Sequence, residues 1–434
     1  MMRRGRKSAV TRRQVSASTT IGRRCCHVCW LPMGVLGLDR QQLAQRNRRL
    51  ATARHCPTRK HQLRDKLLKS IAKLPIPIQR GKNKRLLIIR PDHLGDALLA
   101  TPAIKQLRRA HPDLQIHVLC GPWSAELLAR FPAIDQVRPL PFPAFVRERR
   151  ADNAYLLALR WSRRLREAGG YHCAIIMRPD DWWSAMLAYL AGIPRRIGYH
   201  HANVAPLLTE RQALRHEHAV LQNLRLVKAW TGETDRADIR LEIPLNTADS
   251  AFIEGRLAEL DINRQRLICI HPGSGAASKL WQVDKWAALA DSLRSSLDCA
   301  IVFTGAASES KLVAAIRAQM TQAGHSIGAT SIGQLAALYA KASLVLGPDS
   351  GALHVAAALQ TPTIALFGPA DPVEFAPWGD PARQVVFASD LACAPCRILD
   401  WRDDDPAFHP CVRDIKVDQV LNAALRILSG ADAG

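Results

Sequence analysis

Four short stretches of this sequence place polar side chains and glycines directly after an apolar run: residues 90–96, 271–279, 304–309 and 347–354. Each apolar run has the length of a buried β-strand. Parallel sheets bind ligands at the carboxyl ends of their strands, and a helix N-terminus at that edge favours anionic groups. The four stretches are therefore candidate places for chemistry on an anionic ligand such as a phosphate ester.

In the first stretch, Asp96 follows Arg90 and Gly95 and stands at the start of an apolar helix. An aspartate there can cap the helix or, if it faces a ligand, act as a general base. Gly95 allows the backbone a close approach. The position of Asp96 alone favours the cap.

The second stretch, His-Pro-Gly-Ser-Gly at residues 271–275, is followed by Lys279. The hydroxyl of Ser274, the backbone N–H groups and the lysine could cradle a phosphate, although the spacing is not that of a Walker loop. A flexible surface loop is the alternative. In the third stretch, Glu309 could accept hydrogen bonds from ribose hydroxyls, with helix capping by Ser308 as the alternative.

The fourth stretch runs from Gly347 to His354. Asp349 and Ser350 can cap the helix that begins at Gly351, and His354 lies in the first turns of that helix. The helix N-terminus could bind a phosphate. An ordinary capped turn with a histidine facing the core is equally compatible with these residues.

Two series of alternating apolar strands and helices position the four stretches. The first series covers residues 85–240 and the second residues 241–434, with a change of composition over residues 231–250 that marks the linker. Strands that alternate with helices predict parallel βαβ units. We therefore expect an α/β protein with two Rossmann-like parallel-sheet domains and a ligand in the cleft between them.

The net charge of +22 is concentrated in an N-terminal extension, residues 1–84. Residues 1–85 hold 23 Lys or Arg and 2 Asp or Glu, whereas the rest of the chain holds 37 and 36. The near-neutral body argues against a nucleic-acid-binding protein. The extension should be largely disordered, apart from a basic amphipathic helix over residues 62–74 that would suit an anionic membrane. A solvated tail is the alternative.

No apolar run approaches the roughly 18–20 residues that span a bilayer, and the N-terminus lacks the apolar core of a secretory signal. These features predict a cytoplasmic protein with mostly reduced cysteines. Cys393, Cys396, His409 and Cys411 could form a zinc site, although their spacing is not that of a standard zinc motif. Reduced thiols in a loop are the alternative.

Taken together, three motifs resemble those of glycosyltransferase family 9, the ADP-heptose:lipopolysaccharide heptosyltransferases. They are Arg90-x4-Gly95-Asp96-x4-Thr101-Pro102-Ala103, then His271-Pro272-Gly273-Ser274 with Lys279-x-Trp281 and Trp286, and finally Gly347-x-Asp349-Ser350-Gly351-x2-His354 with a Pro-Thr-Ile-Ala-Leu-Phe-Gly run that ends at Gly368. The resemblance implies a GT-B fold. It also implies an inverting, metal-independent transfer of heptose from ADP-heptose to the lipopolysaccharide inner core, without a further cofactor.

The resemblance assigns roles residue by residue. Asp96 matches the general base that deprotonates the acceptor hydroxyl, and Lys279 matches the cation at the donor diphosphate. Asp349 matches a residue at the donor sugar, and the start of the next helix matches the diphosphate cradle. Glu309 matches a ribose contact. The predicted donor site as a whole comprises Ser274, Lys279, Glu309, Asp349, Ser350, Gly351 and His354.

No motif identifies the acceptor side, for which the candidates are Arg90, Arg178, Asp180, Asp181 and Arg195. The resemblance implies a lipid-linked saccharide acceptor at the inner face of the inner membrane, where a basic tail would increase residence. Two alternatives stay open. One is a family 9 transferase with another nucleotide sugar or surface-glycan acceptor, and the other is a non-catalytic nucleotide- or nucleic-acid-binding protein.

Overall fold

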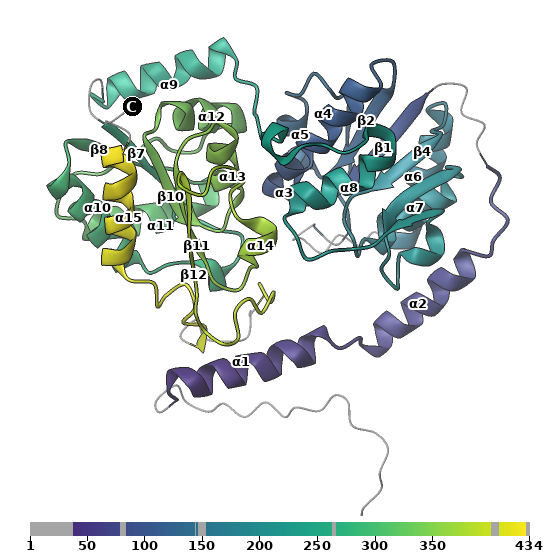
Figure 1. Cartoon of the computed structure of the whole chain (residues 1–434), viewed down its shortest axis with the longest axis horizontal. Helices are drawn as coiled ribbons and strands as arrows, with labels where there is room; N and C mark the ends of the chain where they lie inside the picture. The colour runs from purple at the N-terminus through teal and green to yellow at the C-terminus, as the bar shows by residue number, and fades with distance from the viewer. Residues whose placement is uncertain are drawn as a thin grey trace, which may run out of the picture. The chain divides into compact units, whose positions relative to one another are not determined.

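The structure, a computed structural model, describes residues 38–78, 84–143, 145, 153–262, 266–400 and 408–430. Within these ranges the chain forms two six-stranded sheets in which every paired neighbour is parallel (Figure 1). The predicted α/β architecture of two Rossmann-like halves is confirmed.

The first half is built on a sheet with the strand order β3-β2-β1-β4-β5-β6, the doubly wound order of a Rossmann fold. Its strands are β1 (Arg85–Arg90), β2 (Gln115–Cys120), β3 (Gln136–Pro139), β4 (Cys173–Ile176), β5 (Arg195–Tyr199) and β6 (Glu210–Gln212). Its helices are α3 (Leu94–Leu99), α4 (Thr101–Ala110), α5 (Pro122–Leu128), α6 (Ala154–Glu167), α7 (Trp182–Leu190) and α8 (Ala219–Thr231), with a 3-10 turn η1 (Ala205–Leu207).

The second half repeats this order when its strands are counted from β7, because its sheet runs β12-β11-β10-β7-β8-β9. Its strands are β7 (Arg266–Ile270), β8 (Cys299–Phe303), β9 (His325–Ser326), β10 (Leu344–Pro348), β11 (Thr363–Phe367) and β12 (Gln384–Ala388). Its helices are α9 (Thr247–Glu259), α10 (Val283–Ser296), α11 (Ser310–Gln319), α12 (Ile332–Lys341), α13 (Gly351–Ala358), α14 (Pro372–Phe375) and α15 (Val417–Gly430). The 3-10 turns are η2 (Arg236–Asp238), η3 (Ala277–Lys279) and η4 (Ala307–Glu309).

The central strands are buried on both faces, which explains their continuous apolar sequences. Along β1, Leu86 and Ile88 pack into one hydrophobic cluster, whereas Leu87 and Ile89 pack into another. This alternation follows from the two-residue period of a strand. The cluster that holds Leu86 also contains residues of β7 and β10, so the two halves share one continuous core.

Each sheet has one switch point, the place where the direction of the strand order reverses. It lies beside the first strand of each half. In the first sheet it lies between β1 and β4, and in the second between β7 and β10. The crevice outside the carboxyl ends of such strands is where doubly wound sheets bind ligands. Three of the four candidate stretches follow β1, β7 or β10 and therefore lie at the two switch points.

Residues 38–78 correct one expectation about the extension. This segment forms two helices, α1 (Arg40–His55) and α2 (Arg59–Ile71), where the sequence predicted one helix within a largely disordered tail. Helix α1 packs on the second half, with Ala44 in a core cluster there, and α2 packs on the first half through the fully buried Leu68. Residues 1–37 lie outside the described residues, and the domain boundary near residue 240 stays a prediction.

Among the residues that the structure describes, none of the helices combines the length and the apolar character needed to cross a bilayer.

Candidate active site

The carboxyl ends of β1 and β4 are joined by a network of charged side chains. Arg90 is buried, donates a hydrogen bond from Nη1 to the carbonyl oxygen of Met177 at 3.1 Å, and lies 3.3 Å from Asp96 between Nη2 and Oδ1. Arg90 Nε also lies 3.2 Å from Asp92 Oδ2. Arg178, which follows the neighbouring strand β4, pairs with Asp92. It also donates a hydrogen bond from Nε to Asp180 Oδ1 at 2.7 Å. The guanidinium groups of Arg90 and Arg178 thus pair with the carboxylates at this switch point.

Asp96 is the carboxylate of this network that is best placed to act as a base. Burial raises its pKa to about 6, the charge of Asp92 adds to the rise, and the charges of Arg90 and Arg178 oppose it. Burial also acts to raise the pKa of Asp92, but Arg90 and Arg178 outweigh that effect and lower it. The Asp96 side chain keeps 31% of its surface exposed, so it can meet a ligand. Near neutral pH it would be mostly ionised yet more basic than an ordinary aspartate.

The carboxyl ends of β7 and β10 bring together the predicted donor residues. Lys279 Nζ lies 2.5 Å from Asp349 Oδ2, and both side chains are largely buried. Ser274 Oγ donates a hydrogen bond to the carbonyl oxygen of Asp349 at 3.1 Å. The loop after β7 is therefore attached to the start of α13, and its lysine lies beside the turn that begins this helix.

Two buried polar atoms at the start of α13 have no hydrogen-bond partner, Ser350 Oγ and His354 Nδ1. Ser350 is the N-cap residue, yet its side chain makes no capping hydrogen bond. Burial lowers the pKa of His354 to about 4 despite the opposing charge of Asp349, so the imidazole is neutral near pH 7. Buried polar groups are normally paired, and two unpaired atoms beside a helix N-terminus indicate a place for a ligand.

Glu309 lies against the loop that follows β7. A β-carbon added to Gly273 would lie 2.0 Å from Glu309 Oε1, so the glycine lets this carboxylate lie directly against the loop. Glu309 Oε2 accepts a hydrogen bond from the backbone N–H of Ala306 at 2.7 Å, which gives Glu309 rather than Ser308 the local capping contact. The structure thus brings the predicted ribose contact to the same edge as Ser274 and Lys279.

The two switch points meet where α3 contacts α13. A β-carbon on Gly95 would lie 2.7 Å from His354 Cδ2 and 3.3 Å from Gly351 Cα. The charge of Asp349 contributes to the raised pKa of Asp96, which shows that the two carboxylates lie within electrostatic reach of each other. The candidate base and the candidate diphosphate cradle therefore belong to one site.

Arg195, predicted on the acceptor side, does not belong to this site. It begins β5, so it lies at the amino edge of a parallel sheet whose carboxyl edge carries Arg90 and Arg178. Its guanidinium donates to Glu210 Oε1 at 2.7 Å and stacks over Trp230, which are structural contacts. By contrast, the sequence after the carboxyl end of β4 contains Arg178, Asp180 and Asp181, which places them at the edge that carries Arg90.

The proposed zinc ligands are also not supported by the ligand geometry. Cys393, Cys396, His409 and Cys411 line one small cavity. They are not among the groups of three metal-binding side chains with ligand atoms within 4.8 Å of one another that the described residues contain.

The group that does meet this distance is His216, Asp371 and Glu374. Both carboxylates already pair with the guanidinium group of Arg397, which lies 2.5 Å from Asp371 Oδ2 and 3.1 Å from Glu374 Oε2. These contacts assign the cluster to an ion-pair network.

Asp92 is the site residue that the sequence analysis assigned no role. It is 3% exposed and lies between Arg90 and Arg178, so it orients both cations around Asp96. The signal was present in the sequence, because Asp92 directly follows the Arg-Pro pair at the end of β1. It could have been assigned by the same strand-end argument as the other residues.

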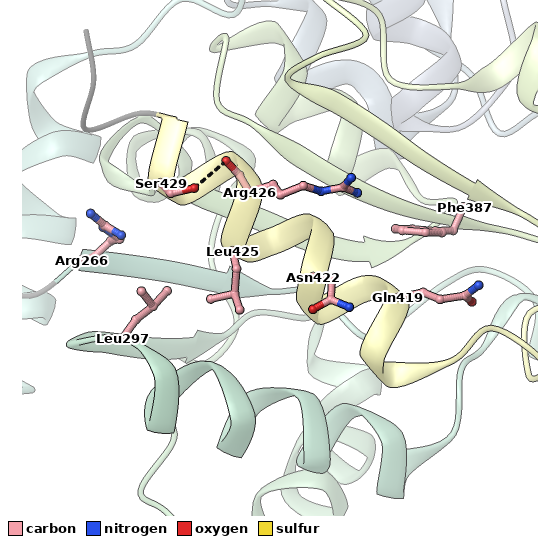
Figure 2. Close-up of a pocket in the computed structure, with 8 residues that line it drawn as sticks. All are labelled: Arg266, Leu297, Phe387, Gln419, Asn422, Leu425, Arg426 and Ser429. Atoms are coloured by element: carbon pink, nitrogen blue, oxygen red, sulfur yellow. Dashed lines mark hydrogen bonds between the residues drawn. The ribbon is translucent and has the colours of Figure 1, made fainter.

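A cavity of about 760 Å³ opens beside helix α15 (Figure 2). It is lined by Arg266, Leu297, Phe387, Gln419, Asn422, Leu425, Arg426 and Ser429. Arg266 begins β7, whereas the donor residues follow the carboxyl end of that strand. The paired charges and the unsatisfied buried atoms lie at the switch points and not at this cavity, so the switch points are the candidate active site.

The sequence matches the model of glycosyltransferase family 9 (heptosyltransferase) over residues 158–400. It is 27% identical over 359 residues to lipopolysaccharide heptosyltransferase 2 of Salmonella typhimurium, an alignment that covers 80% of this chain and 99% of that protein. It is also 27% identical over 315 residues to lipopolysaccharide heptosyltransferase 1 of Pseudomonas aeruginosa, covering 72% of this chain and 86% of that protein.

Two solved structures share the fold. A glycosyl transferase family 9 protein of Veillonella parvula superposes with a TM-score of 0.65 at 22% identity, covering 81% of this chain and 99% of that one. The E. coli ADP-heptose lipopolysaccharide heptosyltransferase II gives a TM-score of 0.61 at 21% identity, with 80% and 99% covered. The fold is therefore GT-B, as the family resemblance implied.

The family match covers more than half of the chain, and it includes the strand ends that carry Arg178, Lys279 and Asp349. The chain therefore belongs to glycosyltransferase family 9, and it is a glycosyltransferase.

Proposed function

We propose that this protein transfers heptose from ADP-heptose to the inner core of lipopolysaccharide, with inversion at the anomeric carbon and without a metal ion. The relatives named as lipopolysaccharide heptosyltransferases support the transferred sugar and the acceptor, and the E. coli ADP-heptose lipopolysaccharide heptosyltransferase II supports the donor. The observation that carries the proposed chemistry is the meeting of Asp96 with the start of α13 through Gly95 and Gly351. A base on one half then faces a diphosphate cradle on the other.

In the proposed reaction, Asp96 takes the proton of an acceptor hydroxyl while that oxygen attacks the anomeric carbon of the donor. The bond from this carbon to the diphosphate breaks, and the products are the glycoside, ADP and one proton. Attack from the side opposite to the leaving group inverts the anomeric configuration. The raised pKa of Asp96 makes it a stronger base than an ordinary aspartate, while it stays mostly ionised near neutral pH.

Negative charge builds on the diphosphate as it leaves, and the residues at the second switch point would stabilise it. Lys279 supplies a full positive charge, and the N-terminus of α13 supplies backbone N–H groups and its dipole. Ser350 Oγ and His354 Nδ1 are the buried atoms free to bind the donor. Because the chain itself provides these groups, the proposal requires no divalent ion for charge compensation.

On the acceptor side, Arg178 and Asp180 follow β4 beside the Asp96 network, with Asp180 exposed. A guanidinium and a carboxylate there could bind the anionic and hydroxyl groups of an acceptor saccharide. We propose that the protein works in the cytoplasm, as a peripheral protein at the inner face of the inner membrane, because a lipopolysaccharide precursor is anchored there by its lipid.

The test combines purified full-length protein with ADP-heptose and a heptose-deficient lipopolysaccharide acceptor. We expect release of ADP, a mass increase of one heptose on the acceptor, and activity that persists in EDTA. The anomeric configuration of the product, read by NMR, should be opposite to that of the donor. Loss of activity in EDTA with recovery on adding a divalent ion would refute metal independence.

A panel of other nucleotide sugars completes the test. If ADP-heptose gives no product and another nucleotide sugar both raises the melting temperature and is consumed, the assigned donor is wrong while the transferase activity stands. If Asp96→Asn transfers heptose at the wild-type rate, the assigned base is wrong.

A further inference from the structure

Exposed large hydrophobic side chains are concentrated on helix α6 of the first half and on the segment of α2 that packs on this half. Among the described residues eleven such side chains occur, and six of them lie on α2, on the segment after it, or on α6. The four within the helices are Leu63 and Leu67 on α2, which are 66% and 43% exposed, and Leu156 and Leu159 on α6, which are 60% and 46% exposed. Single exposed leucines are ordinary, but a concentration of them indicates an interaction surface.

Helix α2 separates its buried stripe from its exposed leucines. Leu68 is fully buried, and Arg64 and Ile71 share its side of the helix. Leu63 and Leu67 are four residues apart and form a second stripe, rotated by about 100° from the first. Lys60 and Lys66 are exposed next to this second stripe. The helix thus attaches to the protein by one side and presents leucines and lysines on another.

Helix α6 repeats this arrangement. Its buried residues are Ala158, Ser162 and Leu165, which occupy one side of the helix. Leu156 and Leu159 lie on the other side with the exposed Arg160 and Arg163. Both helices carry a strong positive charge, because α2 contains five Lys or Arg and one Asp, and α6 contains four Arg and one Glu.

The two helices meet around Trp182, the first residue of α7. Arg64 of α2 stacks over the Trp182 ring at 5.4 Å, and Tyr155 of α6 packs on the same ring at a centroid distance of 5.8 Å. Trp182 directly follows Asp180 and Asp181 and begins α7, the helix after the carboxyl end of β4. The exposed leucines therefore lie beside the edge where the acceptor is proposed to bind.

We propose that an anionic phospholipid bilayer binds this docking face, defined as Leu63, Leu67, Leu156 and Leu159 with Lys60, Lys66, Arg160 and Arg163. The leucines would enter the boundary between headgroups and acyl chains, and the lysines and arginines would pair with lipid phosphates. The combination of leucines with positive charge favours such a surface over a neutral protein partner.

The inference rests on the proposed function, because a lipid-anchored acceptor must enter from a membrane. A bilayer on the docking face would present the saccharide next to Arg178 and Asp180, while the donor residues at the carboxyl edge of the second sheet would remain accessible from the aqueous side. Membrane binding and sugar transfer use different residues, so they can be measured separately.

The test measures flotation of full-length protein with vesicles of phosphatidylcholine containing about one-third phosphatidylglycerol, and with vesicles of phosphatidylcholine alone. Wild type should bind the anionic vesicles and lose binding as salt rises. We expect the variants Leu63→Ser/Leu67→Ser and Leu156→Ser/Leu159→Ser each to bind at least tenfold more weakly. Arg160→Glu/Arg163→Glu should lose more than about fivefold for each arginine.

The matched control is Leu245→Ser/Phe252→Ser, which removes two hydrophobic side chains that are 42% and 43% exposed elsewhere and should bind vesicles like wild type. All variants should transfer sugar to a water-soluble, delipidated acceptor at the wild-type rate. Failure of that transfer in wild type would contradict the proposed function but not the docking face.

Wild-type vesicle binding by both leucine variants would overturn the proposal. So would loss of binding only when residues 1–37 are removed. A wild-type molecular mass of two chains in light scattering, reduced to one chain by the leucine variants without any vesicle binding, would instead assign the face to a second copy.

Discussion

Protonation of Asp96 should stop the transfer reaction as the pH falls through about 6. The pKa of this carboxyl is raised to about 6, mainly by burial and by the neighbouring charge of Asp92. A general base must be unprotonated to accept a proton. With a pKa of 6, about 90% of Asp96 is ionised at pH 7 and about 9% at pH 5, so kcat/KM should fall about tenfold per pH unit below the pKa.

Substitution of Asp96 separates this base from other groups that titrate. Asp96→Asn keeps the size of the side chain and removes its basicity, and it should lower kcat/KM by about 10²–10⁴ at pH 7.5. The residual activity of the variant should no longer fall between pH 7 and pH 5. Steady-state rates of ADP release across pH 5–8 measure both effects.

Substitutions of the neighbouring charged residues provide a second test of the pKa of Asp96. Arg178 lowers the pKa of Asp96, so Arg178→Gln should move the acidic limb of kcat/KM to higher pH. Asp180 is not among the main groups that set the pKa of Asp96, so Asp180→Asn should move the limb less than Arg178→Gln, even if acceptor binding weakens. A flat wild-type profile from pH 5 to 8, or an Asp96→Asn variant with more than about a tenth of wild-type activity, would refute the assignment.

Substitutions at three further positions test the rest of the site and its support. Lys279→Ala should lower kcat by about 10²–10³ in steady-state assays, because it removes the cation at the leaving diphosphate, and Lys279→Arg should retain more activity. Gly95→Ala should lower kcat/KM, because its added carbon would lie 2.7 Å from the His354 ring, and a wild-type rate would show that the contact is dispensable. Leu68→Ala should reduce the free energy of unfolding by about 2–5 kcal/mol in urea denaturation, whereas a loss below about 1 kcal/mol would show that α2 is not firmly packed.

The sequence predicted the parts of the fold that depend on regular apolar patterns. Strands β1, β7 and β10 have continuous apolar sequences because both faces of each are buried, and each ends within two residues of the start of the polar stretch predicted to follow it. The strand ends then located most of the site, because parallel strands direct their carboxyl ends to one edge. Glu309, Lys279 and Asp349 meet at that edge as expected.

The elements that the sequence analysis missed lack such a pattern. Strands β6 and β9 are three and two residues long and carry only polar side chains, so their existence depends on a neighbouring strand. Helix α1 has no apolar stripe, since it packs through the small Ala44 and Ala51 and through Asn47, which donates to the carbonyl oxygen of Phe408. Its capping box, from Asp39 to Gln42, was a readable signal of a helix start.

Arg195 illustrates a different limit. A basic residue near a strand is equally visible in the sequence at either end of that strand, but only the carboxyl edge of a parallel sheet faces the ligand crevice. Arg195 begins its strand, and its side chain is used in an ion pair with Glu210. The direction of the strand, together with its register in the sheet, decides which basic residues can reach a ligand.

The meeting of the two halves could not be read from either half alone, and it determines how the base and the donor site influence each other. Asp349 pairs with Lys279, yet its charge also acts on Asp96 and raises the pKa of that carboxyl. A donor diphosphate would compete with Asp349 for Lys279 and add negative charge near Asp96. By Coulomb's law this change disfavours the ionised form of Asp96 further, so donor binding would make the base stronger. The base and the diphosphate cradle thus form one coupled electrostatic unit, which requires the close contact that Gly95 and Gly351 allow.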